Sequence, residues 1–173
     1  MSSKIPTVRQ VAWISVVPHS LVMAIIMGIW YQFNKAEFVI YGAITYLILS
    51  QLLRGLLAQS HRRGMAKVKS EKFAEAIPIF EKSYNFFKKY DWVDKYRFLT
   101  LLSSGRMTYK EMALNNIAFC YGQMGNGKLS KEYYERTLSE YPDSGMAKAA
   151  LRMLNSVSSS VENGESESSI EVV

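Results

Sequence analysis

The chain has 173 residues, the length of one domain or of a small domain with an anchor. Its net charge of +6 is unevenly distributed, because residues 156–173 carry four acidic and no basic side chains. One cysteine excludes an internal disulfide framework, and two histidines exclude a histidine-rich metal site.

Two long apolar runs near the N-terminus predict a pair of membrane-spanning helices. Residues 11–31 contain no charged side chain, and residues 38–58 contain only Arg54. At 1.5 Å per residue the first run extends over ~31 Å, about the hydrocarbon thickness of a bilayer. Trp30 and Tyr31 argue against a cleaved signal peptide, because they stand where small residues would be needed. The alternative is a buried hairpin of a soluble protein.

Basic residues predict the orientation of this hairpin. Lys4 and Arg9 precede the first run, whereas the loop at residues 32–37 holds one lysine and one glutamate. The positive-inside rule therefore predicts a multi-pass integral membrane protein with residues 1–10 and the C-terminus in the cytoplasm and a short external loop. The cluster that follows the second run could also bind anionic lipid headgroups, whereas nucleic acid is not expected at a membrane-bound cluster. This cluster comprises Arg54, Arg62, Arg63, Lys67 and Lys69.

Small residues recur every four positions in the first run, at Ser20, Ala24 and Gly28. Such a stripe lets helix backbones approach closely in lipid. Packing against the second run is the simpler explanation, and homo-oligomerisation is the alternative. His19 has no acidic or basic companion in either run, so a neutral histidine bonded within the helix is expected rather than a proton relay.

Residues 59–157 have the spacing of amphipathic helices and contain a helix–turn–helix unit at 111–144. Thr108 and Glu111 fit a capping box at the start of its first helix, Gly125 marks the turn, and Pro142 ends the unit.

This unit resembles a tetratricopeptide repeat over 34 residues. The positions that carry the resemblance are Leu114, Ala118, Tyr121, Gly125, Ser130, Tyr134, Thr137 and Pro142. A weaker copy at residues 60–90 has Gly64, Phe73, Ala76, Phe80 and Ser83 in the same register. The resemblance implies an all-α fold, in which a transmembrane hairpin precedes a short helical solenoid. The layout is similar to small two-span bacterial membrane proteins of this family, which implies an inner-membrane scaffold that binds a polypeptide.

The remaining segments complete this prediction. Residues 60–70 are expected to form a basic stalk that continues the second span, because they lack an apolar face. Residues 91–102 predict a helix that folds onto the stack through Trp92, Val93, Tyr96 and Leu99. A capping helix is predicted at 146–157, and residues 158–173 are expected to be a disordered acidic tail.

No catalytic or cofactor-binding motif occurs in the sequence, so neither an enzyme nor a cofactor is expected. Asp91 and Asp94 are explained by helix capping, and Cys120 by a packed helix. The family's carboxylate clamp is not expected either, because only Asn116 matches it. The predicted function is a scaffold that binds a cytosolic protein, and the alternative is an accessory subunit of a larger membrane complex. The predicted partner-binding residues are Asn115, Asn116, Phe119 and Gln123.

Overall fold

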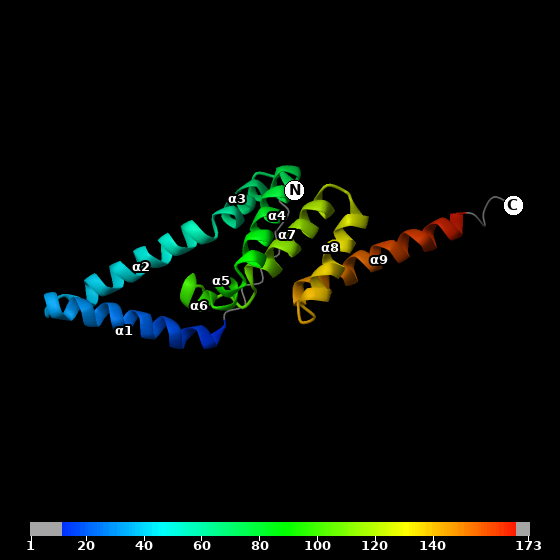
Figure 1. The fold of residues 1–173 in the computed structure, drawn as a ribbon. Coiled ribbons are helices and arrows are strands. Elements are labelled where there is room, and N and C mark those ends of the chain that lie inside the picture. The colour runs from blue at the N-terminus through cyan, green and yellow to red at the C-terminus, as the bar shows by residue number, and fades with distance from the viewer. Residues whose placement is uncertain (1–11, 169–173) are drawn as a thin grey trace.

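The computed structural model describes residues 12–168, and those residues form helices joined by turns, with no strand among them (Figure 1). The expectations for residues 1–10 and 169–173, including the positions of Lys4 and Arg9, lie outside the described residues. The elements in chain order are η1 (Trp13–Ser15), α1 (Val16–Phe33), α2 (Phe38–Leu57), α3 (Gln59–Lys69), α4 (Phe73–Lys89), α5 (Asp91–Lys95), α6 (Arg97–Thr100), α7 (Tyr109–Gln123), α8 (Gly127–Glu140) and α9 (Gly145–Ser168).

The first two helices form the expected apolar hairpin. Trp13–Phe33 has a mean hydropathy of 1.7 and Phe38–Leu57 of 1.4, and both are long enough to cross a membrane. Only 6% and 11% of their apolar windows are buried inside the protein. They are therefore not core helices of the described part of the chain, which argues against the alternative of a buried soluble hairpin.

In the contact between α1 and α2, large side chains of α1 meet a glycine, a threonine and a tyrosine of α2. A Cβ on Gly42 would lie 2.8 Å from Met27 Cγ, and Trp30 Nε1 donates to Thr45 Oγ1 at 3.0 Å. Trp30 also stacks on Tyr41 with ring centroids 5.0 Å apart. The small residue that permits close approach is thus on α2.

The stripe of Ser20, Ala24 and Gly28 does not face α2, although the sequence favours packing of this stripe against the second apolar run. All three residues are exposed, and a Cβ on Gly28 would have no atom within 4 Å. The stripe points away from α2 because the Met27 and Trp30 positions occupy the face between the two helices. Packing of the stripe against the second helix is therefore not observed.

Helix α3 corrects the prediction of a basic stalk. The chain breaks helical geometry at Ala58 (φ −102°, ψ 23°), and α3 then packs along α4 instead of continuing α2. Its buried residues are His61, Gly64 and Val68. A Cβ on Gly64 would lie within 2.6–2.9 Å of three Phe80 ring atoms, so the aromatic ring fits directly over the glycine. Two of the three buried residues of α3 are a histidine and a glycine, which a search for bulky apolar residues does not detect.

Two helical pairs, α3–α4 and α7–α8, stack through α4 and α7, and α9 packs against α8 (Figure 1). The main core contains Ala76, Phe80, Leu114 and Ile117. Gly125 adopts φ +76° in the α7–α8 turn, and α4 runs through Pro78, both as expected. This is the predicted all-helical arrangement, while its assignment to the tetratricopeptide family stays a prediction.

Two segments differ from the prediction for the C-terminal half. Residues 91–102 form two short helices that break at Tyr96, and Val93 is buried whereas Trp92, Tyr96 and Leu99 are exposed. Helix α9 continues to Ser168 and so covers most of the segment for which composition predicts disorder. Figure 1 shows its C-terminal part extending beyond the helical stack.

Candidate functional site at the junction of the hairpin and the helical stack

The α5–α6 segment connects the apolar hairpin to the helical stack. In Figure 1, α5 and α6 lie where α1 and α2 diverge, and α6 contacts α1. The amide of Ala12, just before η1, donates to the Ser104 carbonyl at 2.9 Å. On the other side, Leu57 and Ala58 pack with Phe87, Val93 and Leu101. Both ends of the hairpin therefore contact the α5–α6 segment and the loop that follows it.

Arg54 is the polar part of this attachment. Its Nε donates to the Leu101 carbonyl at 3.2 Å, and its Nη2 donates to the Leu102 carbonyl. Carbonyls at the end of a helix lack partners within that helix, and a cation there also interacts favourably with the helix dipole. Leu102 adopts φ +45°, which turns the chain after α6. The sequence predicts that Arg54 reaches lipid headgroups, whereas the structure engages its guanidinium with protein carbonyls.

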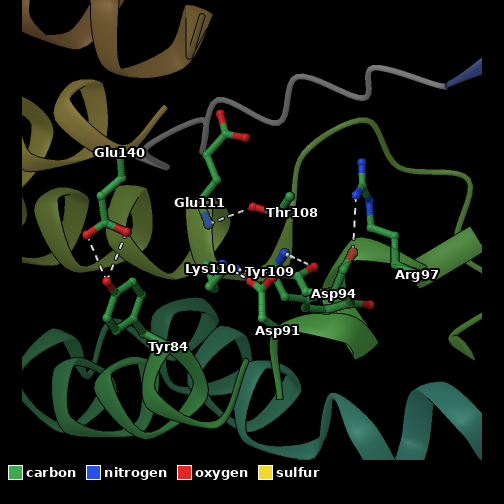
Figure 2. A network of polar contacts seen from close by, with 9 residues as sticks. All are labelled: Tyr84, Asp91, Asp94, Arg97, Thr108, Tyr109, Lys110, Glu111 and Glu140. Carbon is green, nitrogen blue, oxygen red and sulfur yellow. Dashed lines mark hydrogen bonds and ion pairs between the residues drawn. The ribbon is translucent and has the colours of Figure 1, made fainter. Parts of the chain in front are cut away.

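Asp94 anchors the segment to the start of α7 (Figure 2). The backbone amides of Tyr109 and Lys110 donate to its two carboxylate oxygens at 2.8 and 3.0 Å. Thr108 Oγ1 accepts from the Glu111 amide at 3.1 Å, so three of the first amides of α7 have acceptors. Asp94 is 1% exposed, and this burial raises the pKa of its carboxyl against the opposing effect of the two amides.

Arg97 lies beside Asp94 and closes the loop that follows α6. Its guanidinium donates to the carbonyls of Gly105 at 3.1 Å, Arg106 at 2.5 Å and Asp94 at 3.2 Å. Burial lowers the pKa of Arg97, while the Asp94 carboxylate opposes that shift. Asp91 is exposed and forms an ion pair with Lys110. The two aspartates therefore hold separate structural contacts. Asp94 does cap a helix, but it caps α7 rather than its own helix. The capping prediction is wrong for Asp91, which pairs with Lys110 and makes no cap hydrogen bond at the start of α5.

His61 and Cys120 are buried groups of the stack. His61 is 7% exposed between the rings of Phe80 and Tyr109, with centroids 5.4 and 5.3 Å away. Burial lowers the pKa of His61 to about 4 and raises the pKa of the Cys120 thiol to about 11. A protonated thiol in a packed core is a poor nucleophile, which agrees with the inert cysteine that the sequence suggests.

The predicted partner-binding residues do not all share one exposed face. Asn115 is 1% exposed and donates from Nδ2 to the Glu111 carbonyl at 3.0 Å, so it is a buried residue and not part of a groove. The prediction that Asn115 is exposed is wrong, because Asn115 lies on the same side of α7 as Ala118, which packs with Tyr134 of α8. Asn116 and Phe119 are half-buried and face α3 and the start of α4, where they contact Met65 and Phe73. Gln123 is exposed at the end of α7.

Only part of the basic cluster is free to contact lipid headgroups. Arg62, Arg63 and Lys69 are exposed on α3. Lys67 is paired with Glu75, with Nζ 2.5 Å from the carboxylate oxygen. Three of the five predicted cations are thus free of the contacts that hold Arg54 and Lys67.

An open hollow of about 480 Å³ was not anticipated from the sequence. It lies between the start of α7 and the α8–α9 turn. Its lining mixes charges of both signs and includes Arg106, Glu111, Glu140, Asp143 and Ser144. The sequence analysis identified Pro142 as the end of the helical unit, but nothing indicated that Arg106 would line the same hollow.

Comparison of the chain with protein-family models, curated proteins and solved structures found no match in any of the three. Among residues 12–156, whose side chains the structure describes, no three His, Cys, Asp or Glu residues gather in a way that could hold a metal ion.

Proposed function

We propose that the chain is a membrane-anchored helical scaffold of the tetratricopeptide type that binds a cytosolic polypeptide. The observation that carries the proposal is the attachment of a lipid-compatible hairpin to a rigid helical stack through Arg54 and the α5–α6 segment. In this arrangement the hairpin is an integral anchor with both termini in the cytoplasm, as the positive-inside rule predicts. The stack is the binding module and takes no part in catalysis.

The surface between α3 and α7 is the proposed binding face. Asn116 and Phe119 are half-buried there, next to Met65 and Phe73, and Gln123 extends the face at its exposed end. Partly exposed amide and aromatic side chains of this kind provide hydrogen bonds and contact area without a large loss of side-chain entropy. Asn115 is not part of this face because its side chain is buried.

Site-specific photocrosslinking in native membranes tests this function. A photoreactive residue at Gln123 or Phe119 is expected to capture a cytosolic protein, whereas one at Lys131, exposed on α8, is the matched control. Capture of the same protein from α7 and not from α8 supports the scaffold. Capture from neither α7 position in membranes that contain the intact chain contradicts it.

The alternative function is an accessory subunit of a larger membrane complex, and one observation favours it. Ser20, Ala24 and Gly28 are exposed on the outer face of α1 and leave a narrow surface on which another helix can pack closely. A photoreactive residue at Ala24 would then capture another membrane-spanning chain, or a second copy of this one, while positions on α7 capture nothing.

A further inference from the structure

The α5–α6 segment exposes three large apolar side chains that its helical spacing assigns to a core. Trp92 is 60%, Tyr96 57% and Leu99 53% exposed, whereas Val93 from the same series is 3% exposed. We call these three residues the α5–α6 patch. A contiguous group of large exposed apolar side chains marks a site of contact with a protein or a membrane.

The patch is continuous with the apolar surface of the hairpin. Trp92, Tyr96 and Leu99 line a shallow hollow of about 350 Å³ together with Pro18 of α1, and its walls are almost entirely apolar. Beside Pro18, Val16 and Val17 are 51% and 72% exposed. The medium that surrounds this end of α1, whether water or lipid, therefore also surrounds the α5–α6 patch.

The patch lies at the level where a membrane-spanning hairpin leaves the hydrocarbon. Pro18 is five residues from Trp13, the first residue of the first apolar segment, and Arg54 is three residues from Leu57, the last of the second. At 1.5 Å per residue these contacts lie roughly 7 Å and 5 Å inside the ends of the two segments. Interfacial helices bury their apolar side chains about 5–10 Å into the headgroup and acyl boundary.

Charge around the patch fits the same boundary. Lys95 Nζ lies 5.8 Å from the Tyr96 ring centroid, and Lys89 Nζ lies 5.3 Å from that of the neighbouring Tyr90. Lysine beside tyrosine and tryptophan is the composition found at membrane interfaces, where the ring enters the boundary and the ammonium group meets phosphate.

We propose that the α5–α6 patch is an interfacial membrane-binding element, which inserts Trp92, Tyr96 and Leu99 among lipid headgroups. This inference rests on the proposed hairpin anchor and adds a function for the segment that joins it to the stack. The occupant of the patch is the bilayer surface. Because α5–α6 is bonded to α7 through Asp94, insertion fixes the orientation of the whole stack relative to the membrane.

Spin-label accessibility in pure lipid vesicles tests the proposal on the full-length chain. A nitroxide is attached to Leu99→Cys, and separately to Tyr96→Cys, in a Cys120→Ala background. The protein is reconstituted into vesicles of phosphatidylcholine mixed with phosphatidylglycerol. Lys131→Cys, exposed on α8, is the matched control. The labels at 96 and 99 are expected to be shielded from a water-soluble nickel complex and accessible to oxygen, and the label at 131 to show the opposite.

Vesicle flotation separates the two hypotheses. Protein that floats with the vesicles but whose labels at 96 and 99 are as accessible to nickel as the label at 131 overturns the inference and leaves the anchor intact. The same result is expected if the true occupant of the patch is a protein partner. The vesicles contain no other protein, so the patch would then stay exposed to water. Protein that fails to float refutes the hairpin anchor itself, and the inference fails with it.

Discussion

His61 shows how one buried titratable residue can govern the response of this chain to acid. It is enclosed by Phe80 and Tyr109, its Nδ1 has no hydrogen-bond partner, and burial lowers its pKa from 6.5 to about 4. The unfolded chain therefore binds a proton at a pH at which the folded chain does not. The part of the stability that depends on neutral His61 is therefore fully present above about pH 6.5 and is lost as the pH falls towards 4.

Replacing His61 tests this linkage. At about 1.4 kcal/mol per pKa unit, the wild-type chain is expected to lose about 3 kcal/mol of unfolding free energy between pH 6.5 and 4 through His61. In His61→Phe, which keeps an aromatic ring between Phe80 and Tyr109, this part of the loss disappears. Denaturant unfolding of the detergent-solubilised chain at several pH values measures the difference. Parallel stability curves for the two proteins would show that His61 does not titrate on unfolding.

Asp94 is the residue that joins the α5–α6 segment to α7. Both of its carboxylate oxygens accept backbone amides at the start of α7, and Arg97 is buried beside it. Asp94→Ala removes both acceptors, so we expect a loss of about 2 kcal/mol, the upper end of the range for a helix cap. Asp94→Asn keeps one oxygen acceptor and is expected to lose less. Thermal unfolding ranks the variants, and equal losses for alanine and asparagine would argue that the capping bonds contribute little.

At the scale of elements, α3 and α4 approach each other closely at Gly64. Gly64 lies under the Phe80 ring, and a Cβ there would come within 2.6–2.9 Å of it. Since Phe80 is fully buried, its ring cannot move without disturbing the core. Gly64→Ala is therefore expected to destabilise the chain by roughly 1–3 kcal/mol.

Gly145→Ala is the matched control for this substitution. Gly145 is the first residue of α9, and a Cβ there would have no atom within 4 Å. Alanine is the better helix former, so no loss of stability is expected at this position. A similar change in melting temperature for the two variants would mean that α3 does not pack on α4 as closely as described.

The same elements show which parts of the fold the sequence could predict. The apolar hairpin and the α7–α8 turn were predictable because each depends on neighbouring residues only. The hairpin follows from two apolar runs long enough to cross a membrane. The turn follows from Gly125, which adopts a positive φ. Helix α3 was mistaken for a stalk because its packing depends on Phe80, sixteen residues away from Gly64. No local pattern indicates that a glycine and a histidine will be buried beside Val68 on one face of α3.

The candidate site was less predictable for a related reason. Helical spacing alone cannot distinguish a face that meets another helix from one that meets solvent or lipid, so it assigned Trp92 and Tyr96 to the core and Asn115 to the surface. The bonds of Arg54 and Asp94 join positions forty-seven and fifteen residues apart. Such contacts follow from the tertiary arrangement and leave no signal in the neighbouring sequence.

For the whole molecule, the central question is on which side of the membrane the stack lies. The exposed cations Arg62, Arg63 and Lys69 follow the second apolar helix, whereas the α1–α2 loop has one residue of each sign, Lys35 and Glu37. The positive-inside rule therefore predicts that the stack lies in the cytoplasm and the loop on the opposite side. In that orientation, the half-buried and exposed residues of α7 would meet cytosolic partners, as the proposed function requires.

Cysteine labelling of intact cells tests this orientation. Lys35→Cys and Lys131→Cys, each exposed and each in a Cys120→Ala background, are treated with a membrane-impermeant maleimide. Lys35→Cys is expected to be labelled in intact cells, and Lys131→Cys only after the membrane is permeabilised, because a charged reagent cannot cross the hydrocarbon. The reverse pattern would place the stack outside, and labelling of both in intact cells would mean that the two apolar helices do not form a spanning hairpin. Equal labelling of the two variants after permeabilisation confirms that both cysteines are chemically reachable.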